Sequence, residues 1–184
     1  MKCYNDSIKK KLFFVVNVDW FFISHRLPLA LHAIKVGYDV YVLTSDTGRI
    51  KELEKYGIQI ITIPFKRFGT NVFHELKCIL LLRKYYSHYK PDIIHHVTLK
   101  AALLGSLAAK LTKCKNVINA ISGFGYNFTD DRNGIIQKII KLMINIAFKG
   151  DFYFILQNQD DIRMIDMMHL VETFHLNSYK RIRR

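Results

Sequence analysis

The stretch NVDWFFISHR, residues 17–26, contains the first side chains that could bind a charged ligand. Ser24 is a favourable N-cap for a helix that begins directly after it, with Pro28 in the first turn, where a missing N–H costs little. The free amides of that turn and the Arg26 guanidinium would then suit an anion such as a phosphate. In the alternative interpretation, His25 and Arg26 only solvate the end of the helix.

A second polar group is HHVTLK, residues 95–100. Neighbouring residues of a strand face opposite sides, so His95 and His96 cannot both bind one metal ion, and one of them is expected to pack beneath a helix. His96, Thr98 and Lys100 are the candidates for a cleft, where a hydroxyl and an ammonium group could hold a sugar or a diphosphate. Thr98 is equally suited to cap the helix that follows.

The third stretch is NAISGFGYNF, residues 119–128. Its small residues, among them Ser122, Gly123 and Gly125, let a ligand or another domain approach the backbone closely. A plain turn would not need the three aromatic residues that follow, which suit stacking or packing against a partner surface. We interpret the stretch as the wall of a cleft.

Several common sites are absent from the sequence. No G-x-G-x-x-G follows the first apolar run and no G-x-x-x-x-G-K-[ST] occurs, which argues against a redox Rossmann enzyme and a P-loop enzyme. Cys3, Cys78 and Cys114 lack metal-binding spacing and are expected to be reduced thiols of a cytosolic protein. We therefore expect neither a metal ion nor a cofactor.

The elements that must position these residues alternate along the chain. Runs rich in β-branched and aromatic residues predict strands over 12–18, 38–44, 58–63, 92–97, 116–121 and 151–156. Helical patterns lie between them, over 25–36, 48–56, 71–89, 99–112 and 134–149, with a further helix near residue 160. The alternation predicts an α/β fold, a Rossmann-like doubly wound parallel sheet, with its ligands at the carboxyl ends of the strands.

The formal net charge of +13 predicts an anionic partner, such as nucleic acid, an acidic membrane surface or a phosphorylated substrate. A compositional bias of the genome toward lysine is the alternative explanation. The helix over 134–149 is apolar almost all round, so it is either buried or lies at a membrane interface, and the helix over 71–89 permits the same interpretation. No apolar run reaches the roughly 18 to 20 residues of a transmembrane helix.

Four stretches together, FFISHRLPLALHAIKVGYDVYVLT, IIHHVTLKAALLGSLAAKL, NAISGFGYNF and LQNQDD, resemble the N-terminal domain of family 4 glycosyltransferases of the GT-B type. The resemblance is to the bacterial enzymes that build capsular or lipopolysaccharide sugar chains. It implies two Rossmann-like domains that face each other across a cleft and need no metal. The N-terminal domain would handle an acceptor, often a lipid-linked one, and the C-terminal domain would hold the nucleotide sugar.

The resemblance also assigns roles to single residues. The residues expected to face the donor diphosphate are Asp19, Ser24, His25 and Arg26. Those expected to line the acceptor cleft are His96, Thr98, Lys100, Ser122, Gly123 and Gly125. Many relatives carry a histidine after the fifth strand, but this chain has Ala120, Ile121 and Ser122 there, so a catalytic histidine cannot be assigned.

We divide the chain into a basic segment over 1–11, the family-like domain over 12–163 and a tail over 164–184 that departs from the family. With a permitted choice of codons, NSYKRIRR read one base later encodes the Gly-Ser-Gly-Val turn of the family, so a frameshift that truncates the enzyme is expected. The predicted function is the acceptor half of a glycosyltransferase of surface polysaccharide biosynthesis, inactive alone, in the cytoplasm on the inner face of the membrane.

The alternative is a non-catalytic, membrane-bound acceptor subunit that works with a separate donor-binding chain. A nucleic-acid binder would explain the charge but not the three polar stretches, and no recognised nucleic-acid module is present. Nucleic acid is therefore not an expected partner.

Overall fold

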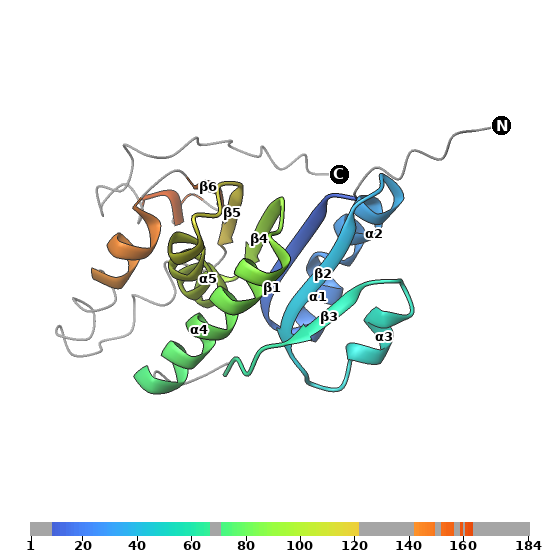
Figure 1. The fold of residues 1–184 in the computed structure, drawn as a ribbon, viewed down its shortest axis with the longest axis horizontal. Coiled ribbons are helices and arrows are strands. Elements are labelled where there is room, and N and C mark those ends of the chain that lie inside the picture. The colour runs from blue at the N-terminus through green and yellow to red at the C-terminus, as the bar shows by residue number, and fades with distance from the viewer. Residues whose placement is uncertain are drawn as a thin grey trace.

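The computed structural model of the chain describes residues 9–66, 71–121, 142–149, 152–156, 159 and 161–163. Within these ranges six strands form one sheet in the order β3-β2-β1-β4-β5-β6, and every neighbouring pair is parallel (Figure 1). The strands are β1 (Lys11–Val18), β2 (Asp39–Ser45), β3 (Gln59–Thr62), β4 (Ile93–Val97), β5 (Val117–Ile121) and β6 (Tyr153–Leu156). The predicted Rossmann-like parallel sheet and its six strands are confirmed.

Helices connect the strands. They are α1 (Asp19–His25), α2 (Leu27–Lys35), α3 (Ile50–Glu54), α4 (Val72–Tyr89) and α5 (Leu99–Thr112). Residues 142–148 are also helical, inside the range predicted over 134–149. In the described part of the chain, no helix combines the length and the apolar character needed to cross a membrane.

The sheet separates two apolar cores. Alternate residues of β1 point to opposite faces, so Phe13 and Val15 pack with α4 and α5, whereas Phe14 and Val16 pack with α1 and α2. Figure 1 shows α4 and α5 on one side of β1 and α2 on the other. The strand is therefore apolar at nearly every position because both of its faces are covered.

Helix α1 is the element that the sequence did not predict. It occupies a stretch interpreted as a loop before a helix at 25–36, and a sharp junction at Arg26 separates it from α2. Phe22 is fully buried and packs edge-on against Phe14 with ring centroids 5.3 Å apart. Burial of this aromatic ring stabilises a seven-residue helix that would be marginal on its own.

Candidate functional site

The order of the strands reverses between β1 and β4, which are neighbours in the sheet although α1, α2, β2, α3, β3 and α4 lie between them in sequence. In open α/β sheets, ligands bind in the crevice at the carboxyl ends of the strands where such a reversal occurs. The strands end at Val18 and Val97, so the residues around these two positions form the candidate site.

Ser24 does not cap a helix. It lies in the last turn of α1, and its hydroxyl oxygen is 3.1 Å from the backbone oxygens of both Trp20 and Phe21. The amide of Arg26 donates to the backbone oxygen of Phe22 at 2.8 Å, so it is not free for a ligand. The prediction of an N-cap at Ser24 is wrong because α1 continues through the position where the helix was expected to start.

Asp19 is fully buried and holds the loop after β2. Its carboxylate accepts hydrogen bonds from the amides of Thr47 at 2.8 Å and Arg49 at 3.0 Å, from the Thr47 hydroxyl, and from the amide of Trp20. Burial alone would raise the pKa of Asp19, but these hydrogen bonds outweigh it and lower the pKa below its ordinary value. The observed role of this carboxylate is to fasten the loop.

Arg26 and His25 differ in their surroundings. The exposed His25 ring stacks on Phe21 with centroids 4.1 Å apart. Arg26 is half-buried, its Nε has no hydrogen-bond partner, and within the described ranges no carboxylate pairs with its guanidinium. Burial lowers the pKa of Arg26, and its charge helps to lower that of His95, so it lies near this histidine on the side of α1 and α2. Among the described residues, Arg26 is thus a cation without a counter-charge.

Thr98 caps α5 in an unusual backbone conformation. Its φ of 86° and ψ of 153° lie in a region that is almost restricted to glycine. The hydroxyl accepts from the amide of Ala101 at 3.5 Å and donates to Oδ1 of Asn17 at 3.1 Å. The predicted helix cap is confirmed, and the strained residue joins the carboxyl ends of β1 and β4. Asn17 was missed because one polar residue at the end of an apolar strand forms no motif.

Lys100 follows in the first turn of α5. Its Nζ lies 2.6 Å from Oε1 of Glu75 in α4 and donates to the backbone oxygen of Lys66 at 3.0 Å. The other carboxylate oxygen of Glu75, Oε2, is buried and makes no hydrogen bond within the part of the chain that the structure describes. Thr98 and Lys100 therefore lie together at one end of α5, with Glu75 as a further carboxylate that the sequence did not indicate.

His96 is fully buried, and its expected position in the cleft is corrected. Its Nδ1 donates to Oδ1 of Asn119 at 2.7 Å, which leaves Nε2 to accept from the Tyr86 hydroxyl at 3.0 Å. Ser106 donates to the same Asn119 oxygen, and Gly105 of α5 packs directly on the imidazole ring. Burial lowers the pKa of His96 to about 4, although the hydrogen bond to Asn119 opposes this. His96 is the histidine expected beneath a helix.

Three of the expected acceptor-cleft residues, Ser122, Gly123 and Gly125, lie outside the described residues. Cys78 and Cys114 are free thiols, as expected, and Cys3 is not among the described residues. Across the described ranges, no cluster of three or more His, Cys, Asp or Glu side chains could hold a metal ion.

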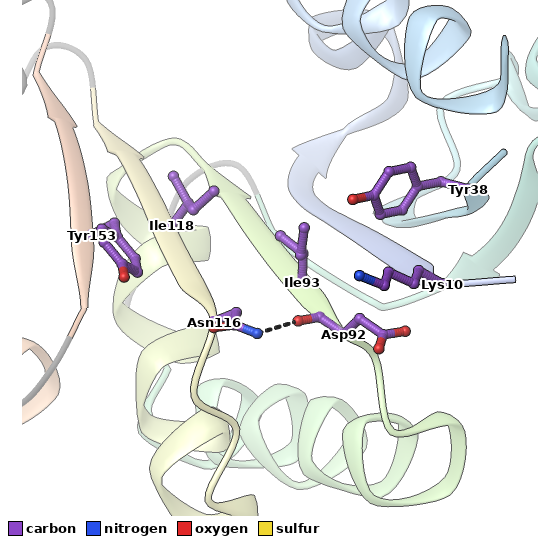
Figure 2. Close-up of a pocket in the computed structure, with 7 residues that line it drawn as sticks. All are labelled: Lys10, Tyr38, Asp92, Ile93, Asn116, Ile118 and Tyr153. Atoms are coloured by element: carbon purple, nitrogen blue, oxygen red, sulfur yellow. Dashed lines mark hydrogen bonds between the residues drawn. The ribbon is translucent and has the colours of Figure 1, made fainter. Parts of the chain in front are cut away.

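A cavity of about 310 Å³ lies at the opposite edge of the sheet (Figure 2). Its lining comes from the beginnings of the strands and the residues before them: Lys10, Tyr38, Asp92, Ile93, Asn116, Ile118 and Tyr153. The Asn116 side chain donates to the backbone oxygen of Asp92 at 2.9 Å, which ties β4 to β5 at this edge. Because the amino ends of the strands are not where such sheets bind substrates, we do not assign this cavity to the candidate site.

Comparison with known proteins gives the family. Residues 11–158 match the family described as Glycosyl transferase 4-like. The chain belongs to this family. CapM of Staphylococcus aureus, a capsular polysaccharide biosynthesis glycosyltransferase, is 34% identical over 109 residues, which are 56% of this chain and 26% of CapM.

A second relative is the UDP-Gal:alpha-D-GlcNAc-diphosphoundecaprenol alpha-1,3-galactosyltransferase of Escherichia coli. It is 22% identical over 92 residues, which are 50% of this chain and 24% of that enzyme. A glycosyltransferase of Rickettsia africae superposes with a TM-score of 0.63 at 17% identity, over 91% of this chain and 42% of the other. The fold is thus one Rossmann-like half of the GT-B architecture. The chain spans about a quarter of the length of the two curated relatives.

Proposed function

We propose that this chain provides the acceptor-side half of a glycosyltransferase of surface polysaccharide biosynthesis. The observation that carries the proposal is the family match over residues 11–158, together with relatives named as capsular and diphosphoundecaprenol-dependent enzymes. The substrates would be a nucleotide sugar as donor and a lipid-linked or saccharide acceptor. The chain alone is expected to bind the acceptor rather than complete the transfer.

Arg26 is the residue we propose for the donor diphosphate. No carboxylate among the described residues pairs with this half-buried guanidinium, and an anionic ligand at the crevice would supply a counter-charge. Asp19 and Ser24 are engaged within the chain, so they are not carried into this proposal. The His25 ring is exposed beside Arg26 and is a weaker candidate for the same ligand.

The proposed inactivity of the chain alone follows from the stabilisation that its described residues can give to the leaving diphosphate. A phosphate near one helix end is stabilised by about 0.3 to 1 kcal/mol, and a single guanidinium adds a charge-assisted hydrogen bond of about 1.5 to 3 kcal/mol. A millionfold rate enhancement needs about 8 kcal/mol from groups that surround the developing charge in a closed site. A second domain facing the carboxyl edge would have to supply the rest.

The test uses the chain alone and the chain fused to the donor half of a family relative. Both are incubated with labelled nucleotide sugars and lipid-linked acceptors. Transfer is expected only from the fusion, and Arg26→Ala should reduce it more than tenfold, whereas the control Arg49→Ala, which removes an exposed pair with Glu52, should not. Transfer by the chain alone would refute its inactivity, and failure of every fusion and donor would refute the proposed reaction.

We also propose that α4 holds the chain on the inner face of the cytoplasmic membrane. Its outer side carries the exposed apolar residues Phe73, Leu76 and Leu80, with Phe73 85% exposed. Lys77 and Lys84 are exposed on the same side of the helix, because residues three, four and seven apart share a face. An apolar stripe beside lysines suits an anionic lipid surface.

Vesicle sedimentation tests this membrane proposal. Each lysine near an anionic surface contributes about 1 kcal/mol, so K77Q/K84Q should weaken binding to anionic vesicles about thirtyfold. The matched control K51Q/K55Q removes two lysines from and beside α3 and should have little effect. Equal losses in both variants, or equal binding of the wild-type chain to neutral vesicles, would refute the role of α4.

A further inference from the structure

The end of β1 presents hydrogen-bond donors in a fixed orientation. The Thr98 hydroxyl accepts from the amide of Ala101, so its own proton is available for Oδ1 of Asn17 at 3.1 Å. This fixes which end of the Asn17 amide is the oxygen. Nδ2 of Asn17 then makes no hydrogen bond within the described residues, and the side chain is only half-buried. Its two N–H groups remain for a ligand.

The backbone of Thr98 maintains this arrangement. At a φ of 86° the backbone of any residue other than glycine is strained. This conformation nevertheless places the Thr98 hydroxyl between the first turn of α5 and the end of β1. Strained residues that link two elements are typical of ligand-binding positions. Thr98 acts here as a positioning residue for Asn17.

An unused acceptor lies at the same edge of the sheet. Glu75, in the first turn of α4, is held through Oε1 by Lys100, which is only two residues after Thr98. Oε2 of Glu75 is buried and has no hydrogen-bond partner among the described residues. The edge therefore combines amide donors from β1 with a carboxylate acceptor from α4.

The chemistry of this pair limits the ligand. A phosphate carries only acceptor oxygens and a negative charge, so it would be repelled by the buried, unpaired oxygen of Glu75. A sugar hydroxyl both donates and accepts, and it can satisfy a carboxylate and an amide together. We propose that Asn17 and Glu75 form a saccharide subsite, in which Asn17 donates to a sugar oxygen and Glu75 accepts from a sugar hydroxyl. The subsite rests on the proposed function, in which this half binds the acceptor.

The experiment measures binding to the intact chain by ligand-observed NMR. The probes are methyl α-glucoside, methyl N-acetyl-α-glucosaminide and inorganic pyrophosphate. A monosaccharide is expected to bind with a dissociation constant on the order of 1 mM. Asn17→Asp and Glu75→Gln should each weaken saccharide binding about tenfold, because each replaces a donor or a charged acceptor without changing the shape of the side chain.

Matched controls are Asn145→Asp and Glu54→Gln, the same changes at exposed positions of other helices. Thr98→Ser, which keeps the hydroxyl, should retain binding, and Thr98→Val, which removes it, should lose binding. Unchanged saccharide binding in both site variants, or no saccharide binding to the wild-type chain, would overturn the subsite. A loss of pyrophosphate binding equal to that of saccharide would overturn its hydroxyl specificity. None of these results would refute sugar transfer by the fused enzyme, which is assayed separately.

Discussion

Replacement of Gly105 by alanine tests the packing of α5 on the buried imidazole of His96. A methyl carbon at this position would lie 2.2 Å from Nε2, 2.5 Å from Cδ2 and 2.7 Å from Cε1 of the ring. Both ring nitrogens are hydrogen-bonded, so the ring cannot turn aside without leaving a buried ring nitrogen or the Tyr86 hydroxyl without a partner. Either the ring or the helix must therefore move.

The size of the effect follows from three contributions. Overpacking of a core costs about 1 to 3 kcal/mol, and a buried polar group without a partner costs about 1 to 3 kcal/mol more. The better helix propensity of alanine returns about 1 kcal/mol. We expect Gly105→Ala to lower the free energy of unfolding by about 3 kcal/mol, and the exposed control Leu111→Ala in the same helix to change it little.

Urea unfolding followed by circular dichroism measures the loss in the wild-type and the His96→Ala backgrounds. Without the imidazole ring, the new methyl group has room, so Gly105→Ala should become neutral or stabilise the second background by up to about 1 kcal/mol. An equal loss in both backgrounds would refute the proposed contact, as would a Gly105→Ala protein as stable as the wild type.

Three further predictions concern stability. Burial lowers the pKa of His95 to about 3 and that of His96 to about 4, so the unfolded chain binds more protons than the folded chain below the ordinary value of 6.5. The free energy of unfolding should therefore fall as the pH drops from about 6.5 toward 4, by up to about 3 kcal/mol per pH unit if both histidines contribute. Urea unfolding that is independent of pH in this range would contradict the prediction. Thr98→Gly and Thr98→Val both lose the hydroxyl cap, but only glycine relieves the backbone strain. The free energy of unfolding should therefore be about 1 to 3 kcal/mol higher for Thr98→Gly than for Thr98→Val, and equal values in calorimetry would contradict the strain. Asp19→Asn should lower the free energy of unfolding by about 2 kcal/mol, because it weakens the charge-assisted hydrogen bonds from the amides of Thr47 and Arg49. An unchanged melting temperature would argue against the role of Asp19 in holding this loop.

The sequence predicted those parts of the fold that depend on local pattern. Strands buried on both faces appear as continuous apolar runs, and α4 and α5 match their predicted bounds within a residue. It did not predict α1, because that helix depends on the contact of Phe22 with Phe14 across the core. The displaced start of the helix also removed the predicted role of Ser24.

The other differences between the predicted and the observed site arise from contacts between side chains that are distant in sequence. Alternation along β4 indicated that His95 and His96 face opposite sides, but only the packing of α5 determines which one is covered by that helix. Asn17 and Glu75 belong to no local sequence pattern. Each is identified only by its contact with a residue of another element, Asn17 by Thr98 and Glu75 by Lys100. Thr98 could be read as a cap because capping is a local property.

The position of β1 in the middle of the sheet also affects how the chain folds during synthesis. The amide of Lys11 at the start of β1 bonds to Asp92, which is 81 residues further along the chain. At about 5 to 20 residues per second, roughly 4 to 16 s pass before a ribosome has made this partner. During that interval β1 can pair with β2, but the face with Phe13 and Val15 still lacks α5. We therefore expect the nascent chain to expose an apolar face of β1 for seconds, a state in which chaperones at the ribosome could bind it.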